Sequence, residues 1–307
     1  MIAIAYETVD VFAEAQFGGN PLAVIADGRG LSTTAMQAMA REFNYSEVTF
    51  VTPPADPTNT ARVRIFTPTN EIPFAGHPNV GTAFVLARAG SVFGRAAGDV
   101  MRFEEGAGLV EVEVLRRDGR VAGASIRAPR ALDVGDEIDV PVVAVCASLA
   151  DDAITTVRHR PIFASVGLPF AFAEVASLEA LASATPNAAA FRDAHARHPN
   201  DVDRFSLFLY VRTAPGTVRA RMFAPLSNIL EDPATGSASA ALAGLLDTFE
   251  GDDEGFRLTI HQGVEMRRPS VIRAIVRPQG RGRSISVAGD CVPVMRGTLT
   301  LVDGDGT

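Results

Sequence analysis

Length, composition and charge place this chain among ordinary globular proteins and exclude several classes. It has 307 residues, 47% hydrophobic and 21% charged, which is enough for two domains with sizeable cores. A net charge of −8 argues against nucleic acid as the main partner, and no apolar run reaches the eighteen residues of a membrane span.

The first residues and the cysteines add two further expectations. The N-terminal stretch lacks the basic flank and apolar core of a signal peptide, which predicts a cytoplasmic protein. Cys146 and Cys291 lie far apart without CxxC spacing, so we expect buried thiols and neither a disulfide nor a metal site. The five histidines are scattered, and no zinc cluster is expected.

The chain opens with a predicted β-hairpin. Residues 4–12 and 22–26 are apolar runs with β-branched and aromatic side chains, separated by the turn signal Phe17-Gly18-Gly19-Asn20-Pro21. The amides of Gly19 and Asn20 could point toward a ligand, although a plain turn is the simpler interpretation of the spacing.

A predicted helix over 32–43 leads to the first candidate catalytic residue. Ser32 can cap this helix, which ends at Asn44-Tyr45-Ser46, and a strand follows at 48–51. Glu47 thus begins an apolar strand, where partial desolvation would raise its pKa and suit it to carry a proton. On this feature alone, a solvated glutamate at a strand end is the favoured alternative.

A strand over 61–66 precedes a second helix, which begins near Gly76-His77-Pro78. The positive end of a helix tends to keep a histidine neutral, so His77 would exchange hydrogen bonds there and carry no charge. A capping histidine without chemistry is an equally good interpretation of this position.

The same arrangement returns in the second half of the chain. A β-like run at 218–223 leads through Glu231-Asp232-Pro233-Ala234-Thr235-Gly236-Ser237 into an Ala/Leu-rich helix that ends near Leu246. Asp232 before Pro233 predicts the start of that helix. Gly236 and Ser237 would leave backbone N–H groups open at its positive end, a place that binds carboxylates and phosphates.

Two spacings indicate an internal duplication. The motifs that begin at Arg64 (Arg-Ile-Phe-Thr-Pro) and Arg221 (Arg-Met-Phe-Ala-Pro) lie 157 positions apart. His77-Pro78 and Asp232-Pro233 lie 155 positions apart, as do Gly81 and Gly236. Coincidence between two strand–turn–helix units is the alternative. The position in the second half that is equivalent to Glu47 lies near Ser206-Leu207 and carries no acidic residue. The two halves therefore differ in chemistry.

The rest of the chain carries few motifs. Alternating residues over 100–126 predict hairpins, and residues 136–150 form a helix or connector near the end of the first half. The chain lacks the GxGxxG and GxxxxGK[ST] nucleotide fingerprints and the GxSxG motif of serine hydrolases.

These blocks resemble the PhzF-like family, named for the phenazine-biosynthesis isomerase. The resemblance runs nearly end to end and rests on Asp10-Val-Phe-Ala, Gly19-Asn-Pro, Ala40-Arg-Glu-Phe-Asn-Tyr-Ser-Glu47, Arg64-Ile-Phe-Thr-Pro, Phe74-Ala-Gly-His-Pro, Glu231-Asp-Pro-Ala-Thr-Gly-Ser and Gln262-Gly-Val-Glu.

The resemblance implies an α+β fold like that of diaminopimelate epimerase. Two pseudo-symmetric lobes, here 1–135 and 136–307, would each wrap a mostly antiparallel sheet around a central helix. Both helix N-termini would face an active-site cleft, and the protein would form a homodimer. Related epimerases and racemases carry a cysteine at each helix start. Here those starts carry Gly76-His77 and Thr235-Gly236-Ser237, which disfavours a two-thiol racemase.

By the same resemblance, Glu47 is the acid/base carboxylate, and His77, Asp232 and Ser237 match the other catalytic positions. Asn20, Ser46, Gly76 and Gly236 would contact the substrate. The implied reaction is proton transfer on a small anionic substrate without cofactor or metal, and without nucleic-acid or membrane partners. A racemase or epimerase of amino or imino acids, and a non-catalytic protein that binds small anions, remain the alternatives.

Overall fold

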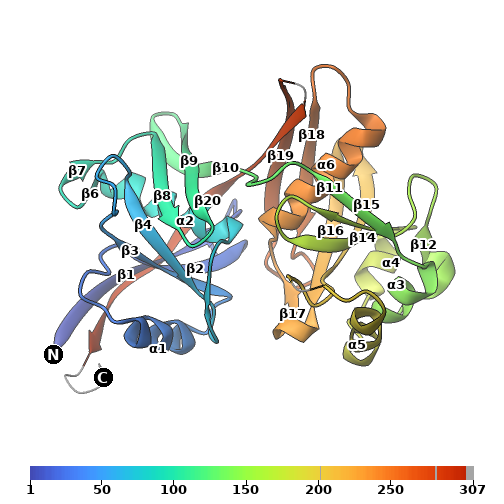
Figure 1. Cartoon of the computed structure of the whole chain (residues 1–307), viewed down its shortest axis with the longest axis horizontal. Helices are drawn as coiled ribbons and strands as arrows, with labels where there is room; N and C mark the ends of the chain where they lie inside the picture. The colour runs from blue at the N-terminus through green and yellow to red at the C-terminus, as the bar shows by residue number, and fades with distance from the viewer. Residues whose placement is uncertain (201, 281, 302–307) are drawn as a thin grey trace. The chain divides into compact units, whose positions relative to one another are not determined.

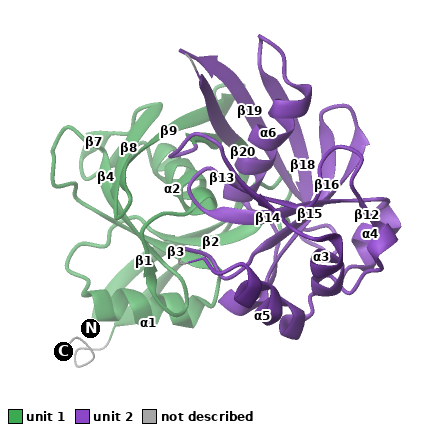
Figure 2. Cartoon of the chain, turned by 45° about the vertical axis from the view of Figure 1, so that its right-hand side comes forward, with its two compact units in different colours: residues 1–127, 288–307 green, residues 128–287 purple. Residues whose placement is uncertain are grey.

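The computed structural model describes residues 1–200, 202–280 and 282–301. The chain divides into two compact units: unit 1 comprises Met1–Arg127 and Ala288–Thr307, and unit 2 comprises Ala128–Val287 (Figure 2). These units differ from the predicted division into 1–135 and 136–307. The reason is strand β20 (Gly282–Leu301), which begins in unit 2 and ends in unit 1, where it pairs with the first strand of the chain.

Unit 1 is built from strands and two helices (Figure 1). Its helices are α1 (Thr33–Phe43) and α2 (Gly76–Ala89). Its strands, besides the end of β20, are β1 (Ile2–Val11), β2 (Asn20–Ile25), β3 (Glu47–Thr52), β4 (Ala61–Phe66), β5 (Glu71–Ile72), β6 (Ser91–Val92), β7 (Arg95–Ala96), β8 (Val100–Glu105), β9 (Gly108–Arg117) and β10 (Arg120–Arg127). The predicted hairpin is β1–β2, and Ser32 caps α1 as predicted, accepting a hydrogen bond from the amide of Ala35.

Unit 2 combines its strands with three short helices and one long helix (Figure 1). Its helices are α3 (Val140–Cys146), α4 (Leu178–Ser183), α5 (Ala188–Arg197) and α6 (Gly236–Glu250), with 3₁₀ turns η1 (Asp151–Ala153) and η2 (Pro225–Ser227). Its strands, besides the start of β20, are β11 (Asp133–Glu137), β12 (Ile154–Thr155), β13 (Ile162–Ser165), β14 (Pro169–Val175), β15 (Leu207–Ala214), β16 (Thr217–Ala224), β17 (Ile229–Asp232), β18 (Phe256–Gln262) and β19 (Ser270–Gln279).

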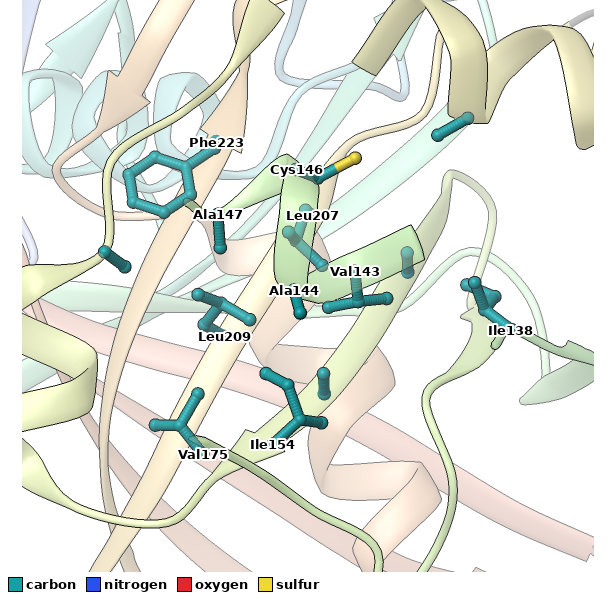
Figure 3. Close-up of a cluster of buried hydrophobic side chains, with 14 of the residues drawn as sticks. Ile138, Val143, Ala144, Cys146, Ala147, Ile154, Val175, Leu207, Leu209 and Phe223 are labelled. Atoms are coloured by element: carbon teal, nitrogen blue, oxygen red, sulfur yellow. The ribbon is translucent and has the colours of Figure 1, made fainter. Parts of the chain in front are cut away.

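The cysteines lie in apolar surroundings. Cys146 belongs to a buried cluster of unit 2 in which α3 packs against strand residues such as Leu207, Leu209 and Phe223 (Figure 3). Both Cys146 and Cys291 are free and buried, which confirms the prediction of buried thiols. Burial raises the pKa of both thiols, so neither is a thiolate near neutral pH.

Strand pairing repeats from one unit to the other. In unit 1, β1 pairs antiparallel with β2, β2 parallel with β3, and β3 antiparallel with β4. Strand β4 then pairs antiparallel with β5 and parallel with β8, which pairs antiparallel with β9. In unit 2 the same sequence of pairings joins β13, β14, β15, β16, β17, β18 and β19. An internal duplication predicts such a repeat.

The repeated arginines have the same task in each unit. Arg64 of β4 makes two hydrogen bonds to the carboxylate of Glu71, at 2.7 and 2.6 Å. Arg221 of β16 does the same with Glu231, at 2.8 and 2.7 Å. Each pair ties the strand before the long helix to the short strand that follows, which explains why an arginine opens both motifs.

The long helices start at equivalent positions, but not at the predicted spacing. Ile65 pairs with Ile72 in unit 1, and its equivalent Met222 pairs with Asp232 in unit 2. The helix starts Gly76 and Gly236 therefore correspond, 160 positions apart instead of 155. The predicted helix start at Asp232-Pro233 is wrong: Asp232 ends β17, and Thr235 is the N-cap of α6. Pro78 is instead inside the first turn of α2, where its missing N–H costs nothing.

Both long helices are buried over most of their length. In α2 every residue from Gly76 to Ala87 is buried, and in α6 every residue from Ala238 to Asp247. Helices that are apolar on all sides belong inside a core, and each helix packs against the strands of its own unit. Among the residues that the structure describes, no helix has the length and hydropathy needed to cross a membrane.

Candidate active site

Glu47 is the first residue of β3, and it pairs with Leu22 of the parallel neighbour β2. The next residues of β3, Val48 to Val51, are buried. The strand therefore holds the side chain of Glu47 at the edge of the core, and only 13% of this side chain is exposed. The carboxylate is largely withdrawn from water, unlike the solvated strand-end glutamate of the alternative interpretation.

His77 lies against this carboxylate. It is the second residue of α2, 7% of its side chain is exposed, and its Nε2 atom is 3.3 Å from Oε2 of Glu47. Burial lowers the pKa of His77 to about 3, so the imidazole is neutral near pH 7, as the helix-start position predicts. The distance is slightly longer than an ordinary N–H···O hydrogen bond, and such contacts often tighten when substrate binds.

Asn20 and Ser46 lie at the same end of the β2–β3 pair as Glu47. The hydroxyl of Ser46 donates to Oδ1 of Asn20 at 3.0 Å, and Asn20 is fully buried. Gly19 precedes them with φ +61°, and a Cβ there would lie 2.3 Å from the carbonyl oxygen of Val11. Only glycine fits this turn, which fixes the start of β2 next to the acid.

Unit 2 holds a hydrogen-bonded group around the start of α6. The Thr235 hydroxyl donates to Oδ2 of Asp232 at 2.5 Å, and the Thr235 amide donates to Oε1 of Gln262 at 3.1 Å. Nε2 of Gln262 donates to the Asp232 carbonyl at 2.7 Å and to the Thr235 hydroxyl at 3.0 Å. All three residues are buried, so the position of Asp232 is fixed by neighbours on both sides.

The first turns of α2 and α6 offer backbone donors. Among the described residues, neither N-cap side chain, that of Ala75 or that of Thr235, accepts a hydrogen bond from its own helix. The amides near Gly76 and Gly236 thus lie at the positive ends of two buried helices without a side-chain cap. Ser237 is partly exposed, whereas its neighbours from Asp232 to Asp247 are buried, so it is the accessible hydroxyl of this helix start.

The predicted site residues form two groups. Unit 1 brings Glu47 and His77 into contact and joins Ser46 to Asn20, with Gly76 beside His77. Unit 2 places Asp232 before α6, while Gly236 and Ser237 begin that helix.

Sequence reasoning assigned no role to Thr235 or Gln262, although both lie in the quoted motifs. The sequence pattern does not single out Glu105 either, because an acidic residue beside a Gly-containing turn is typical of a solvated hairpin. No cluster of three or more His, Cys, Asp or Glu side chains is arranged to hold a metal ion in the described parts of the chain.

A buried carboxylate against a neutral imidazole is typical of enzymes that move protons. The comparisons agree with this class, and the chain belongs to the PhzC-PhzF family of phenazine biosynthesis-like proteins, whose model matches residues 9–297. The predicted family is therefore confirmed.

Two relatives show how close the similarity is. An uncharacterized isomerase of Mesorhizobium japonicum is 38% identical, with 96% of this chain and 98% of the relative covered. The trans-2,3-dihydro-3-hydroxyanthranilate isomerase of Pseudomonas chlororaphis is 35% identical, with coverage of 96% and 99%. This chain is accordingly an isomerase of the PhzF type.

Solved structures support the fold. A PhzF-family protein of Bacillus anthracis superposes with a TM-score of 0.87 at 23% identity, covering 98% of this chain and all of that one. A hydroxyproline epimerase of Agrobacterium vitis superposes with a TM-score of 0.65 at 14% identity, covering 99% and 94%. At these identities the likeness shows the fold alone: a mixed α and β fold shared with PhzF proteins and proline-racemase-like epimerases.

Proposed function

We propose that this isomerase moves a proton within a small, carboxylate-bearing substrate, without a cofactor, and that Glu47 is its general acid/base. The observation that carries the proposal is the 3.3 Å contact between Glu47 and His77, both largely buried. Trans-2,3-dihydro-3-hydroxyanthranilate, the substrate in the name of the 35% identical relative, is the first compound to test.

The proposed reaction uses one carboxylate twice. The Glu47 carboxylate removes a proton from a carbon next to a conjugated system, and the electron pair of the broken C–H bond spreads into that system. The Glu47 carboxylic acid then returns the proton to a second carbon, which regenerates the carboxylate and gives the isomer. Neutral His77 accepts or donates one hydrogen bond at the reacting end and adds no charge to compete for the proton.

The remaining predicted residues bind and orient the substrate in this proposal. The amides at Gly76 and at Gly236 are donors to anionic groups of the substrate, as helix N-termini are for anions in general. The partly exposed Ser237 and the carboxylate of Asp232 complete the catalytic set, and Asn20 and Ser46 contact the substrate.

The two-thiol racemase fits these residues less well. The second residue of α2 is His77 and the second residue of α6 is Ser237, whereas both cysteines are buried elsewhere. A racemase or epimerase that uses Glu47 would exchange the α-proton of an amino or imino acid with solvent. A protein that only binds small anions would exchange nothing, and a panel of both substrate classes in D₂O separates these outcomes.

The deciding experiment is Glu47→Gln, which keeps the shape of the side chain and removes its basicity. We expect turnover and deuterium incorporation to fall by about 10²–10⁴, the usual contribution of general acid–base catalysis. Far-UV circular dichroism and ligand affinity should stay unchanged.

The matched control is Glu42→Gln, which changes an exposed glutamate of α1 and should leave turnover intact. Undiminished turnover of Glu47→Gln would refute the proposal. The homodimer also stays a proposal, and light scattering of the purified chain tests it.

A further inference from the structure

Glu105, the last residue of β8 in unit 1, has a carboxylate whose two oxygens are both buried. Neither oxygen of Glu105 has a hydrogen-bond partner among the described residues, and both are buried; the same holds for Oδ1 of Asn79. All of these atoms are acceptors when Glu105 is ionised. Acceptors buried without a donor are unfavourable, so this arrangement requires an explanation.

Asn79 connects this carboxylate to the start of α2. It is fully buried in the first turn, and its Nδ2 atom donates to the carbonyl of the N-cap residue Ala75 at 2.9 Å. One of the two N–H groups on its amide nitrogen is thus used, whereas its Oδ1 atom requires a donor. His77 lies two residues before Asn79, so whatever orients Asn79 also orients the turn that carries His77.

The duplication shows what this position does in unit 2. Ala61 pairs with Phe103 in unit 1, and its equivalent Val218 pairs with Ile260 in unit 2. Two residues further along each strand, Glu105 therefore corresponds to Gln262.

Gln262 is a neutral side chain with a donor at one end and an acceptor at the other, and it uses both at the start of α6. A protonated glutamate has the same shape and the same two functions, whereas an ionised one can only accept.

We infer that Glu105 is held as a neutral carboxylic acid, which donates its proton to Oδ1 of Asn79 and so positions the start of α2 and His77. Its effect on turnover rests on the proposed function; its protonation state does not. Glu105 is a positioning residue in this account, because it acts through Asn79 and the helix.

The surroundings of Glu105 favour the neutral form. Burial raises the pKa of Glu105 to about 8, and its interaction with Asn79 opposes only part of that shift. On the inner face, α2 contributes the neutral His77. Arg62 and Arg64 of β4 and Glu111 and Glu113 of β9 alternate with buried residues, on the opposite face of the sheet.

Infrared spectroscopy tests the protonation state directly. The difference spectrum between wild type and Glu105→Gln at pH 7 should contain the carbonyl stretch of a protonated carboxylic acid, and the band should disappear as the pH rises through about 8. A spectrum at pH 7 with only carboxylate bands at this residue overturns the inference.

Unfolding gives a second test with a matched control. The raised pKa means that the folded state keeps a proton that the unfolded chain releases, so wild-type stability falls as the pH rises from about 4.5 to 8. The stability of Glu105→Gln should not fall in this way. Its melting temperature should therefore rise relative to that of wild type as the pH increases across that range.

The control is Glu104→Gln, at the neighbouring carboxylate, which accepts hydrogen bonds from Ala55, Asp56 and Asn59 and whose pKa is lowered. The melting temperature of Glu104→Gln should not rise relative to that of wild type over this pH range. Parallel pH dependences of Glu105→Gln and wild type would contradict the inference.

Turnover tests the positioning role. Glu105→Gln should keep kcat at pH 7 within about twofold and should lose less activity than wild type above pH 8, whereas Glu105→Ala should lose on the order of tenfold. Full activity of Glu105→Ala would overturn the positioning role. If Glu47→Gln proves fully active, the proposed function fails, while the infrared and unfolding results still decide the state of Glu105.

Discussion

Nε2 of His77 lies 3.3 Å from Oε2 of Glu47, and each residue is placed by the end of a regular element. Glu47 begins β3 and His77 lies in the first turn of α2, so backbone hydrogen bonds fix both side chains before any substrate arrives. Rigid elements hold reacting groups more accurately than loops do. This arrangement makes the protonation of His77 the first property to measure.

His77→Gln should change how stability depends on pH. The pKa of His77 is lowered to about 3 in the folded state, against 6.5 for an ordinary histidine. Below pH 6.5, His77 of the unfolded chain binds a proton, whereas His77 of the folded state does not. The unfolding free energy of wild type therefore falls by about 1.4 kcal/mol per pH unit down to about pH 3. Above pH 6.5 this contribution is constant.

Urea unfolding of wild type and His77→Gln between about pH 4 and pH 8 measures this effect. The difference in unfolding free energy should shift in favour of the variant below pH 6.5 and be flat above it. His261→Gln is the comparison, because His261 is partly exposed on β18 and lies outside the buried contact with Glu47. A flat difference over the whole range for His77→Gln would show that this imidazole titrates normally.

Gly19→Ala should destabilise unit 1 and disturb Asn20. The residue has φ +61°, and the new Cβ would meet the backbone carbonyl of Val11 at 2.3 Å, so the turn must move. We expect a loss of about 3 kcal/mol or more in unfolding free energy. Gly30→Ala is the control: its φ is +77° but nothing lies near its Cβ, and about 1–2 kcal/mol should be lost. Equal losses would mean that the Val11 contact is unimportant.

Much of this arrangement follows from the sequence. The repeated Arg-x-Phe-x-Pro motifs predict the duplication, and the two strands that contain them, β4 and β16, have equivalent pairing partners in their units. The predicted start of α6 is wrong because Asp-Pro is a strong helix-start signal, whereas the structure uses Pro233 before the helix and Pro78 within one. Local preferences could not distinguish these two uses of proline.

Other features depend on contacts that local patterns do not contain. β20 is one strand of 20 residues shared by both units, although its apolar residues fall in separate stretches of the sequence. Glu105 follows Glu104 in an acidic pair before a turn, a pattern typical of two solvated residues. Only the strand pairing shows that Glu104 faces outward, where it accepts three hydrogen bonds, and that Glu105 faces α2.

Two serines of α6 should respond differently to replacement by alanine. Ser237 is partly exposed at the helix start and belongs to the proposed catalytic set, so Ser237→Ala should lower kcat/KM by about tenfold or more with little change in stability. Ser239 is fully buried, and its hydroxyl has no hydrogen-bond partner in the described part of the chain.

Removing that hydroxyl should therefore be neutral or stabilising by up to about 1 kcal/mol, because a buried unpaired group is lost. Steady-state kinetics and thermal unfolding of both variants give the comparison. If Ser237→Ala retained full activity, the serine would have to leave the proposed catalytic set. A clear loss of stability in Ser239→Ala would indicate a partner for its hydroxyl.

Gln262→Glu should make the start of α6 sensitive to pH. An ionised carboxylate cannot donate to the Asp232 carbonyl or to the Thr235 hydroxyl, both of which Gln262 now reaches at 2.7 and 3.0 Å. Each unpaired buried group costs about 1–3 kcal/mol, so the variant should be clearly less stable than wild type at about pH 8. At about pH 5 the introduced side chain should be a carboxylic acid, which again has a donor, and most of the loss should vanish.

The control for this change is Gln262→Leu, which has no titratable group and should be equally destabilised at both pH values. Urea unfolding at the two pH values separates the variants. The expected direction follows from the linkage of protons to folding: burial raises the folded-state pKa of the introduced acid, so stability is highest at low pH and is lost as the pH rises through that value. An equal loss at both pH values would mean that a carboxylic acid cannot replace the amide here. It would also weaken the corresponding argument for Glu105, because both rest on the same equivalence between a neutral acid and glutamine.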